Sequence, residues 1–240
     1  MILQSLNGIW TLEIPGSEFP ETKASVPGSV YHDLLTAGQI SDPFYRSNED
    51  EALKIMEHDF IYSRSFEAGS ELLNCDAVLL RCHGLDTLAE TEINGRSAGK
   101  ADNMHRTWEY NVKPLLHEGE NEIRITLSSP TKFIREANEK KPQQWPTDAM
   151  KGFSFLRKAH CMFGWDWGPH LPDAGIWRDI ELIGIRKARL RDVYIPQVHE
   201  SGKVTLNIAS HIEMITEGKT EVSISATAPD GKIFSAEGTE

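Results

Sequence analysis

Short segments in which apolar and polar residues alternate constrain the fold of this chain more than any other feature. In residues 122–127, the apolar side chains Ile123, Ile125 and Leu127 take every second position, which puts them on one face of a strand. Residues 77–82 are almost continuously apolar, as in a strand that is buried on both faces. Because turn signals separate the strands about every ten residues, the pattern predicts an all-β sandwich. Further strand patterns occur in residues 9–14, 60–66, 89–93 and 175–185.

Turn and helix signals separate these strands. The dipeptide Asn-Gly at 94–95 is the strongest short signal for a β-hairpin. Ser29 is expected to cap a short helix that carries Val30 and Leu34 and ends at Gly38. A second helix is expected to begin at the Ser-Pro pair 129–130, with proline in its first turn, and to end near residue 142.

Two stretches are expected to be loops, residues 40–49 and residues 142–154. The first of them carries two aromatic side chains, Phe44 and Tyr45. This loop can border a ligand-binding mouth, or it can be a surface crossover with both rings tucked against the body of the protein. The sequence alone favours the crossover.

A change of domain is expected near residues 186–190. The first domain, residues 1–187, is expected to be a complete sandwich, and residues 188–240 contain three further strand patterns and a Pro-Asp-Gly turn at 229–231. An immunoglobulin-like sandwich needs about 100 residues, whereas only about 50 remain after the boundary. We therefore expect the second domain to be the incomplete start of an immunoglobulin-like sandwich.

Composition excludes several classes of function. The 240 residues include 36 acidic and 25 basic side chains, a formal charge of −11, so binding to nucleic acid is not expected. No apolar run approaches the roughly 20 residues of a membrane helix, and the N-terminal residues do not read as a signal peptide. Cys75, Cys82 and Cys161 have no metal-binding or redox spacing, so each is expected to be a free thiol buried as a small apolar side chain. Together these features predict a cytoplasmic protein without a membrane partner.

The sequence offers no evident catalytic machinery or metal site. His160 and His170 are the histidines nearest to the Trp-Asp-Trp segment, but no motif has the spacing of zinc ligands, so neither a metal nor a cofactor is expected. Carboxylates are plentiful, but no pair can be singled out from the sequence as general acid and nucleophile. No catalytic residue is therefore assigned.

The segment Trp165-Asp166-Trp167 is the strongest candidate for a binding site. Gly164 and Gly168 bracket it, which predicts a shaped loop rather than a core strand. Indole rings stack on the apolar face of a pyranose, and a carboxylate accepts hydrogen bonds from sugar hydroxyls. The alternative is a structural turn whose tryptophans plug the end of the sandwich and whose aspartate caps the turn. The residues alone leave both interpretations about equally supported.

A resemblance to a known family favours the first interpretation. The segment 164–169, together with Leu-Arg-Lys-Ala at 156–159, resembles the N-terminal domain of the β-mannosidases of glycoside hydrolase family 2. The resemblance covers residues 6–187 and continues weakly beyond them. The chain departs from the common family pattern at Phe60 and at His170. Other matching motifs occur in the same order: Leu6-Asn-Gly-Ile-Trp10, Val26-Pro-Gly-Ser-Val30, Asp42-Pro-Phe-Tyr45, Asn48-Glu49, Asn94-Gly95, Asn103-Met-His-Arg106, Gly119-Glu-Asn121, Gly175-Ile-Trp-Arg178 and Ile180-Glu-Leu182.

The resemblance implies a jelly-roll, galactose-binding-like sandwich, then immunoglobulin-like domains, then a (β/α)8 barrel that carries the catalytic glutamates. A barrel takes about 250 residues, so this chain is expected to be an N-terminal piece of a longer enzyme. By resemblance, Asp166 contacts hydroxyls of the terminal mannose, Trp165 helps to wall the same subsite, and Trp167 packs the loop. The implied partners are a mannoside or manno-oligosaccharide substrate and the C-terminal barrel of the same parent chain.

Three classes of function stay open at this point. The first is an accessory domain of a retaining β-mannosidase, with a β-galactosidase or β-glucuronidase of the same family as the enzymatic alternative. The second is a non-catalytic carbohydrate-binding module. The third is a β-sandwich that serves only protein contacts. The Trp-Asp-Trp segment favours the β-mannosidase.

Overall fold

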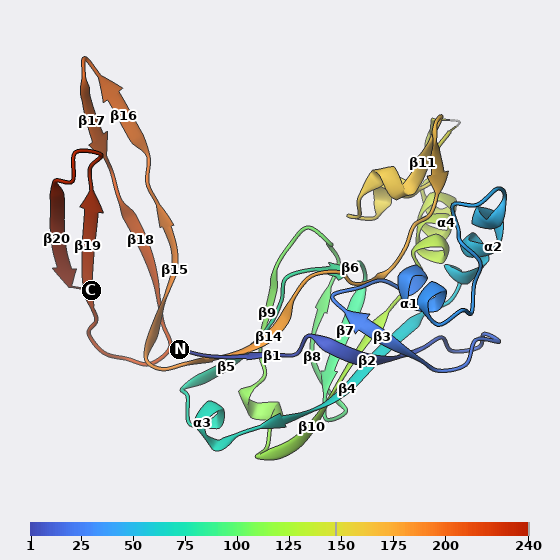
Figure 1. Cartoon of the computed structure of the whole chain (residues 1–240), viewed down its shortest axis with the longest axis horizontal. Helices are drawn as coiled ribbons and strands as arrows, with labels where there is room; N and C mark the ends of the chain where they lie inside the picture. The colour runs from blue at the N-terminus through green and yellow to red at the C-terminus, as the bar shows by residue number, and fades with distance from the viewer. Residues whose placement is uncertain (147, 240) are drawn as a thin grey trace.

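The computed structural model describes residues 1–146 and 148–239. Its first 185 residues form two antiparallel sheets (Figure 1). The larger sheet has the order β3 (Thr22–Val26), β2 (Gly8–Glu13), β4 (Phe60–Ala68), β10 (Gly119–Leu127), β7 (Ala89–Ile93) and β8 (Arg96–Ala101). The smaller sheet has the order β1 (Ile2–Ser5), β14 (Ile180–Ile185), β5 (Ala77–Cys82) and β9 (Trp108–Asn111). A short ribbon pairs β13 (Gly175–Ile176) with β6 (Leu85–Asp86).

The two sheets share one hydrophobic core. Ile123 and Ile125 of β10 are fully buried, as their alternation predicts, and Leu80 of β5 and Leu182 of β14 belong to the same cluster. Strands β4 and β10 pair over nine residues each and lie at the centre of the larger sheet. The predicted all-β class is confirmed, and β5 has the predicted bounds.

The predicted hairpin at residues 94–95 is confirmed. Asn94 and Gly95 have φ angles of 52° and 70°, the left-handed conformation that a tight turn between β7 and β8 requires. The predicted strand at 175–185 is interrupted, because β13 pairs with β6 whereas β14 pairs with β5. At the interruption the Trp177 ring lies against Gly84, where an added Cβ would be 2.5 Å from its Nε1 atom.

Both predicted helices are present, α1 (Val30–Thr36) and α4 (Pro130–Lys140). The Ser129 hydroxyl caps α4 by accepting a hydrogen bond from the Lys132 amide at 3.1 Å. Ser29 precedes α1 as predicted, but its side chain makes no capping hydrogen bond. A third helix, α2 (Asn48–Ile55), begins in the last two residues of the predicted loop 40–49 and continues through residues for which no element was predicted. Its first turn carries three acidic residues, which favour a helix N-terminus. The remaining short helices are α3 (Ser70–Leu73) and the 3₁₀ turns η1 (Lys113–Leu115), η2 (Phe153–Phe155) and η3 (His160–Met162).

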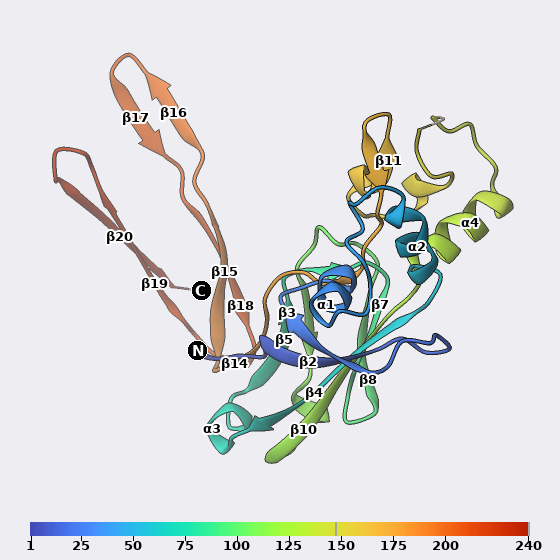
Figure 2. The same cartoon turned by 45° about the vertical axis from the view of Figure 1, so that its right-hand side comes forward.

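Residues 188–239 form three pairs of antiparallel strands, which are mostly exposed. Figures 1 and 2 show them extending away from the sandwich as long ribbons. Two of the pairs are hairpins, β16 (Gln197–Glu200) with β17 (Lys203–Leu206) and β19 (Glu221–Thr227) with β20 (Ile233–Thr239). In the third, β15 (Ala188–Tyr194) pairs with β18 (Ala209–Met214), and the β16–β17 hairpin lies between them in the chain. The predicted domain boundary at residue 187 remains a prediction.

In the described part of the chain, no helix combines the length and apolar composition needed to cross a membrane.

The three cysteines are free thiols, as predicted. Cys75 and Cys82 are buried, and burial raises the pKa of the Cys82 thiol above its usual range. The prediction of burial is wrong for Cys161, which is exposed. It lies in η3, a short turn outside both sheets.

Candidate substrate-binding site

The Trp-Asp-Trp segment folds as the tip of a short β-hairpin. Strand β11 (Phe163–Trp165) pairs with β12 (Gly168–His170), which leaves Asp166 and Trp167 as the two residues of the turn. Gly164 has a φ of 96°, and an added Cβ would be 2.4 Å from the His170 Nε2 atom. The sequence predicted a loop here, whereas the structure has a β-hairpin. Gly164 permits the hairpin because glycine adopts this positive φ without strain.

The side chains at the tip of this hairpin are exposed. Trp165 is 57% exposed and Trp167 is 83% exposed, and Asp166 is exposed between them. The indoles therefore do not plug the end of the sandwich, and the expectation that Trp167 packs the loop is wrong. Trp167 lies in the two-residue turn at the end of the ribbon, and the turn itself is too short to provide a surface on which the indole could pack.

A second segment meets the hairpin and forms a cleft of about 400 Å³ with it. The cleft is lined by Asp166 and Trp167 from the hairpin and by Phe44, Arg46 and Glu49 from the segment leading into α2. Phe44 is 77% exposed, so the prediction that the ring is tucked against the body is wrong. The sequence contained Asp42-Pro-Phe-Tyr45 and Asn48-Glu49 as separate motifs, but nothing in it indicated that they meet residues 166–167.

One contact joins the two segments that form the cleft. The His170 Nδ1 atom lies 3.2 Å from the Glu49 Oε1 atom, which joins β12 to the first turn of α2. Arg46 has a φ of 55°, and its guanidinium lies 5.0 Å from the centre of the Tyr45 ring. Tyr45 is also exposed, contrary to the crossover interpretation. In Figures 1 and 2, β11, α2 and α4 gather at one end of the molecule.

A small apolar cluster supports the hairpin from below. Phe163 at the start of β11 is fully buried against Ile134 of α4 and Leu156. The Phe153 ring lies 6.2 Å from the Phe163 ring and 5.5 Å from the Trp145 ring. The segment 142–154, predicted as loop, therefore carries aromatic packing that holds the base of the hairpin in place. Thr147 within it lies outside the described residues.

A buried ion pair ties the segment before the hairpin to the sandwich. The Lys158 side chain is completely buried, its ammonium pairs with the Asp86 carboxylate, and it donates a 2.5 Å hydrogen bond to the Asp173 carbonyl. The Thr87 hydroxyl donates to the other oxygen of Asp86. Lys158 belongs to the Leu-Arg-Lys-Ala motif, but nothing in the sequence indicated that this lysine is buried.

Two further carboxyl groups lie within the sandwich, the half-buried Asp173 and the buried Asp33. Asp173 accepts hydrogen bonds from the Tyr31 and Ala174 amides at 3.1 and 2.8 Å, yet burial raises its pKa above the usual value. Burial likewise raises the pKa of Asp33, which accepts from the Ser25 amide at 2.9 Å. These groups are packed within the sandwich rather than facing the cleft, so we assign them to the scaffold.

The described residues contain no cluster of three or more histidine, cysteine, aspartate or glutamate side chains that could hold a metal ion. His160 is exposed, whereas His170 is half-buried and contacts Glu49. The cleft therefore offers an aromatic surface, two carboxylates and a guanidinium. Such a set can bind a polyhydroxylated ligand by stacking and by hydrogen bonds.

Comparisons with known proteins identify the relatives of this chain. Residues 10–178 match the family model described as glycosyl hydrolase 2 galactose-binding domain-like. The chain is 29% identical to the β-mannosidase of Capra hircus over 212 residues, which are 85% of this chain and 24% of that protein. It is 31% identical to a probable β-mannosidase of Caenorhabditis elegans over 185 residues, 72% of this chain and 20% of that one. The chain thus spans about a quarter of the length of these curated relatives.

Solved structures agree with the fold. The β-D-mannosidase from Dictyoglomus thermophilum superposes with a TM-score of 0.92 and 36% identity, covering 100% of this chain and 29% of that one. An FMN-binding β-glucuronidase from Facaelibacterium prausnitzii L2-6 gives a TM-score of 0.64 at 19% identity, covering 98% of this chain and 32% of that one. At that identity the second likeness concerns the fold alone.

Proposed function

Because this chain belongs to the glycosyl hydrolase 2 galactose-binding-domain-like family, we propose that it is the N-terminal accessory domain of a retaining β-mannosidase. In this proposal the whole enzyme hydrolyses terminal non-reducing β-D-mannose residues. The chain contributes the hairpin tip to the mannose subsite, and its other partner is the catalytic barrel of the same parent protein. The two catalytic carboxylates then come from the barrel, outside these residues.

The observation that carries the proposal is the exposed tip of the β11–β12 hairpin. An aspartate between two exposed indoles is unusual for a surface that serves no ligand, since large apolar side chains are normally covered. Trp165 supplies an apolar wall for a sugar ring, and the Asp166 carboxylate accepts hydrogen bonds from hydroxyls. The supports below the tip, Phe163 and Lys158, are buried, so the tip is held on a packed base.

The role of Asp166 in this proposal is binding and orientation. Hydrogen bonds from sugar hydroxyls to a carboxylate are charge-assisted and contribute roughly 1.5–3 kcal/mol each in a site closed to water. They also hold the ring in position for displacement at the anomeric carbon. Phe44, Arg46 and Glu49 line the same cleft and form its second wall.

The test is Asp166→Ala in the full-length enzyme, assayed with 4-nitrophenyl β-D-mannoside. We expect kcat/KM to fall by at least ~10–100-fold, while the melting temperature stays nearly unchanged. Asp102→Ala is the matched control, because Asp102 is also exposed but lies between β8 and β9. A lowered melting temperature with unaltered kcat/KM would instead place Asp166 in the scaffold.

Parallel assays separate the remaining alternatives. Faster turnover of the β-galactoside or β-glucuronide than of the β-mannoside would assign the enzyme to another activity of the same family. The 240-residue chain assayed alone is expected to give no turnover above buffer, because glycoside hydrolysis needs a pair of carboxylates that the proposal places in the barrel. Turnover by this chain that survives repurification would contradict that placement.

A further inference from the structure

The tip of the β11–β12 hairpin stands at the end of a ribbon that needs support from outside. Each strand has three residues, and the two strands pair at two positions. An isolated two-stranded ribbon is marginally stable at best in water, so one this short does not fix its own direction. Contacts from neighbouring elements therefore decide where Asp166 and Trp167 lie.

His170 is the residue of β12 that makes such a contact. Its Nδ1 atom lies 3.2 Å from the Glu49 Oε1 atom of α2. The opposite edge of the ring lies against β11, since a Cβ added at Gly164 would be 2.4 Å from the Nε2 atom and 2.5 Å from the Cδ2 atom. Glycine allows this approach because it has no side chain. The imidazole thus spans the space between the ribbon and the helix.

Glu49 stands on an element that is fixed to the core. Ala52 and Ile55 of α2 are buried and belong to the main hydrophobic cluster. The Tyr31 hydroxyl donates a hydrogen bond to the Ala52 carbonyl at 2.8 Å. A side chain on a packed helix holds its partner more precisely than a side chain on a loop. Helix α2 is therefore the fixed support, and the ribbon is the part that is held.

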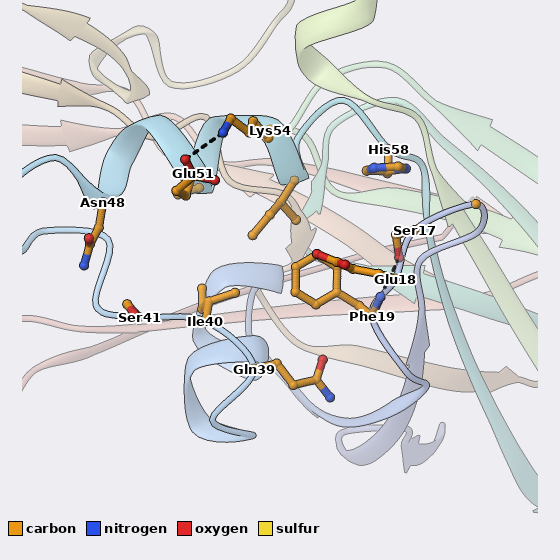
Figure 3. A pocket seen from close by; sticks show the side chains of 13 residues that line it. Ser17, Glu18, Phe19, Gln39, Ile40, Ser41, Asn48, Glu51, Lys54 and His58 are labelled. Atoms are coloured by element: carbon orange, nitrogen blue, oxygen red, sulfur yellow. Dashed lines mark hydrogen bonds and ion pairs between the residues drawn. The ribbon is translucent and has the colours of Figure 1, made fainter.

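Of the three acidic side chains in the first turn of α2, Glu49 is the one that contacts His170. Glu51 pairs with Lys54 of the same helix at 2.6 Å and lines a different cleft, of about 500 Å³ (Figure 3). Among the described residues, Glu49 has no hydrogen-bond or ion-pair partner other than His170. Its carboxylate is therefore committed to the ribbon, whereas that of Glu51 is committed to its own helix.

The contact is directional, and it acts locally. A carboxylate only accepts hydrogen bonds, so the Nδ1 atom donates whether the ring is neutral or charged. A hydrogen bond to a charged acceptor is stronger than one between neutral groups, which favours a single orientation of the ring. The side chains of His170 and Glu49 are 32% and 29% exposed, so water competes with the contact and its contribution to the stability of the whole fold is small.

We propose that His170 is a positioning residue for the mannose subsite. Its hydrogen bond to Glu49 holds the ribbon on α2, so that Asp166 meets the sugar hydroxyls without first losing conformational freedom. A group that is already ordered binds more tightly, because the entropy of ordering is not lost on binding. His170 itself does not line the cleft, so it acts through Asp166. This inference rests on the function proposed for the hairpin.

The first test measures kcat/KM of the full-length enzyme with 4-nitrophenyl β-D-mannoside. His170→Leu should lower kcat/KM at least about fivefold, the scale of one lost hydrogen bond, with little change in melting temperature. His170→Asn should restore most of the loss, because the asparagine amide nitrogen takes the place of Nδ1. His211→Leu is the matched control, since His211 also pairs with a carboxylate, that of Asp192 at 2.8 Å, but lies in β18. It should leave kcat/KM unchanged.

Double variants distinguish positioning from a general structural effect. In the Asp166→Ala background, His170→Leu should lower kcat/KM no further, because the group that it positions is gone. In the Glu49→Leu background it should also have no further effect, whereas in the background of Glu51→Leu it should keep its full effect. Additive losses in the first two backgrounds would overturn the proposal, as would equal activities of His170→Leu and His170→Asn. If His170→Leu does not fold, His170→Ala takes its place.

The second test uses the isotope-labelled 240-residue chain and needs no activity. The NMR order parameters of the Asp166 and Trp167 amides should fall in His170→Leu and stay unchanged in His170→Asn. Equal order parameters in the two variants would overturn the proposal. The two failures can be told apart. If Asp166→Ala leaves kcat/KM unchanged, the function proposed for the hairpin is wrong. If Asp166→Ala lowers kcat/KM and His170→Leu does not, that function stands and only the role of His170 is wrong.

Discussion

Lys158 shows how a single residue ties the candidate site to the fold. Its ammonium has no access to water and is compensated by Asp86 and by the Asp173 carbonyl. Such a pair adds little stability relative to an apolar replacement of both partners, but removing one partner leaves the other charged and buried. The sequence showed this lysine only as part of a motif, because burial of a charge depends on partners 72 and 15 residues away.

Lys158→Met is expected to lower the free energy of unfolding by about 3–5 kcal/mol, measured by urea denaturation of the 240-residue chain. The double variant Lys158→Met/Asp86→Asn should recover part of this loss, because it removes the uncompensated carboxylate. Lys151→Met, at an exposed lysine, is the control and should change stability by less than about 0.5 kcal/mol. If Lys158→Met lowered the free energy of unfolding as little as Lys151→Met does, water would have to reach the Asp86 carboxylate.

At the scale of elements, the strands were predictable and the site was only partly so. Alternation and turn signals are local, so they locate β5, β10 and the β7–β8 hairpin from the sequence. Helix α2 was missed because its acidic first turn looks like loop, and its apolar residues Ala52 and Ile55 pack against partners distant in sequence. The tip residues Trp165 and Asp166 were singled out by composition, whereas Phe44 comes to line one cleft with Asp166 through tertiary packing that no local pattern reveals.

The two glycines of the β11–β12 hairpin are expected to differ in their tolerance of a side chain. Gly164 has a φ of 96°, and an added Cβ would lie 2.4 Å from the His170 ring and 2.9 Å from the Asp148 carbonyl. At Gly168 the nearest atom would be 3.7 Å away, which is an ordinary contact. Gly164→Ala should therefore lower stability by more than about 1 kcal/mol, and Gly168→Ala by less than about 0.5 kcal/mol.

Hydrogen exchange separates a local from a global effect of these substitutions. The Leu171 amide, which donates to the Met162 carbonyl at 2.9 Å, reports on the base of the hairpin. It should lose protection in Gly164→Ala while the amides of β10 keep theirs. Equal effects of the two alanine substitutions would show that the ribbon adapts freely and that its tip is not held in place.

At the scale of the whole molecule, one carboxylate joins the sandwich to the residues that follow it. Glu109 of β9 accepts a hydrogen bond from Arg81 of β5 at 2.8 Å, and two from Arg189 of β15 at 2.9 and 2.5 Å. Arg189 also donates to Glu213 of β18 at 2.6 Å. The pKa of Glu109 is lowered to about 2, and the hydrogen bonds from Arg189 are the main cause. This network fixes the β15–β18 pair against the smaller sheet.

The lowered pKa predicts an acid-sensitive contact. A carboxyl whose pKa is lower in the folded state stabilises that state above its unfolded pKa, near 4.5, and the contribution is lost as pH falls toward about 2. Glu109→Gln should therefore reduce the free energy of unfolding at about pH 7 and reduce its further loss between about pH 4.5 and pH 2. Urea denaturation at a series of pH values measures both effects.

The matched control for this prediction is Glu90→Gln. Glu90 also pairs with a cation, Lys100, but both side chains are mostly exposed, so the pair is screened by water and contributes little. Glu90→Gln should leave the free energy of unfolding at about pH 7 nearly unchanged. The decrease of this free energy at acid pH should be as large as in the chain without substitutions. If Glu109→Gln behaved like the control, Arg189 would not anchor β15 in solution, and residues from 188 onward would be free to move relative to the sandwich. The orientation of any following domain would then have to be set by contacts elsewhere.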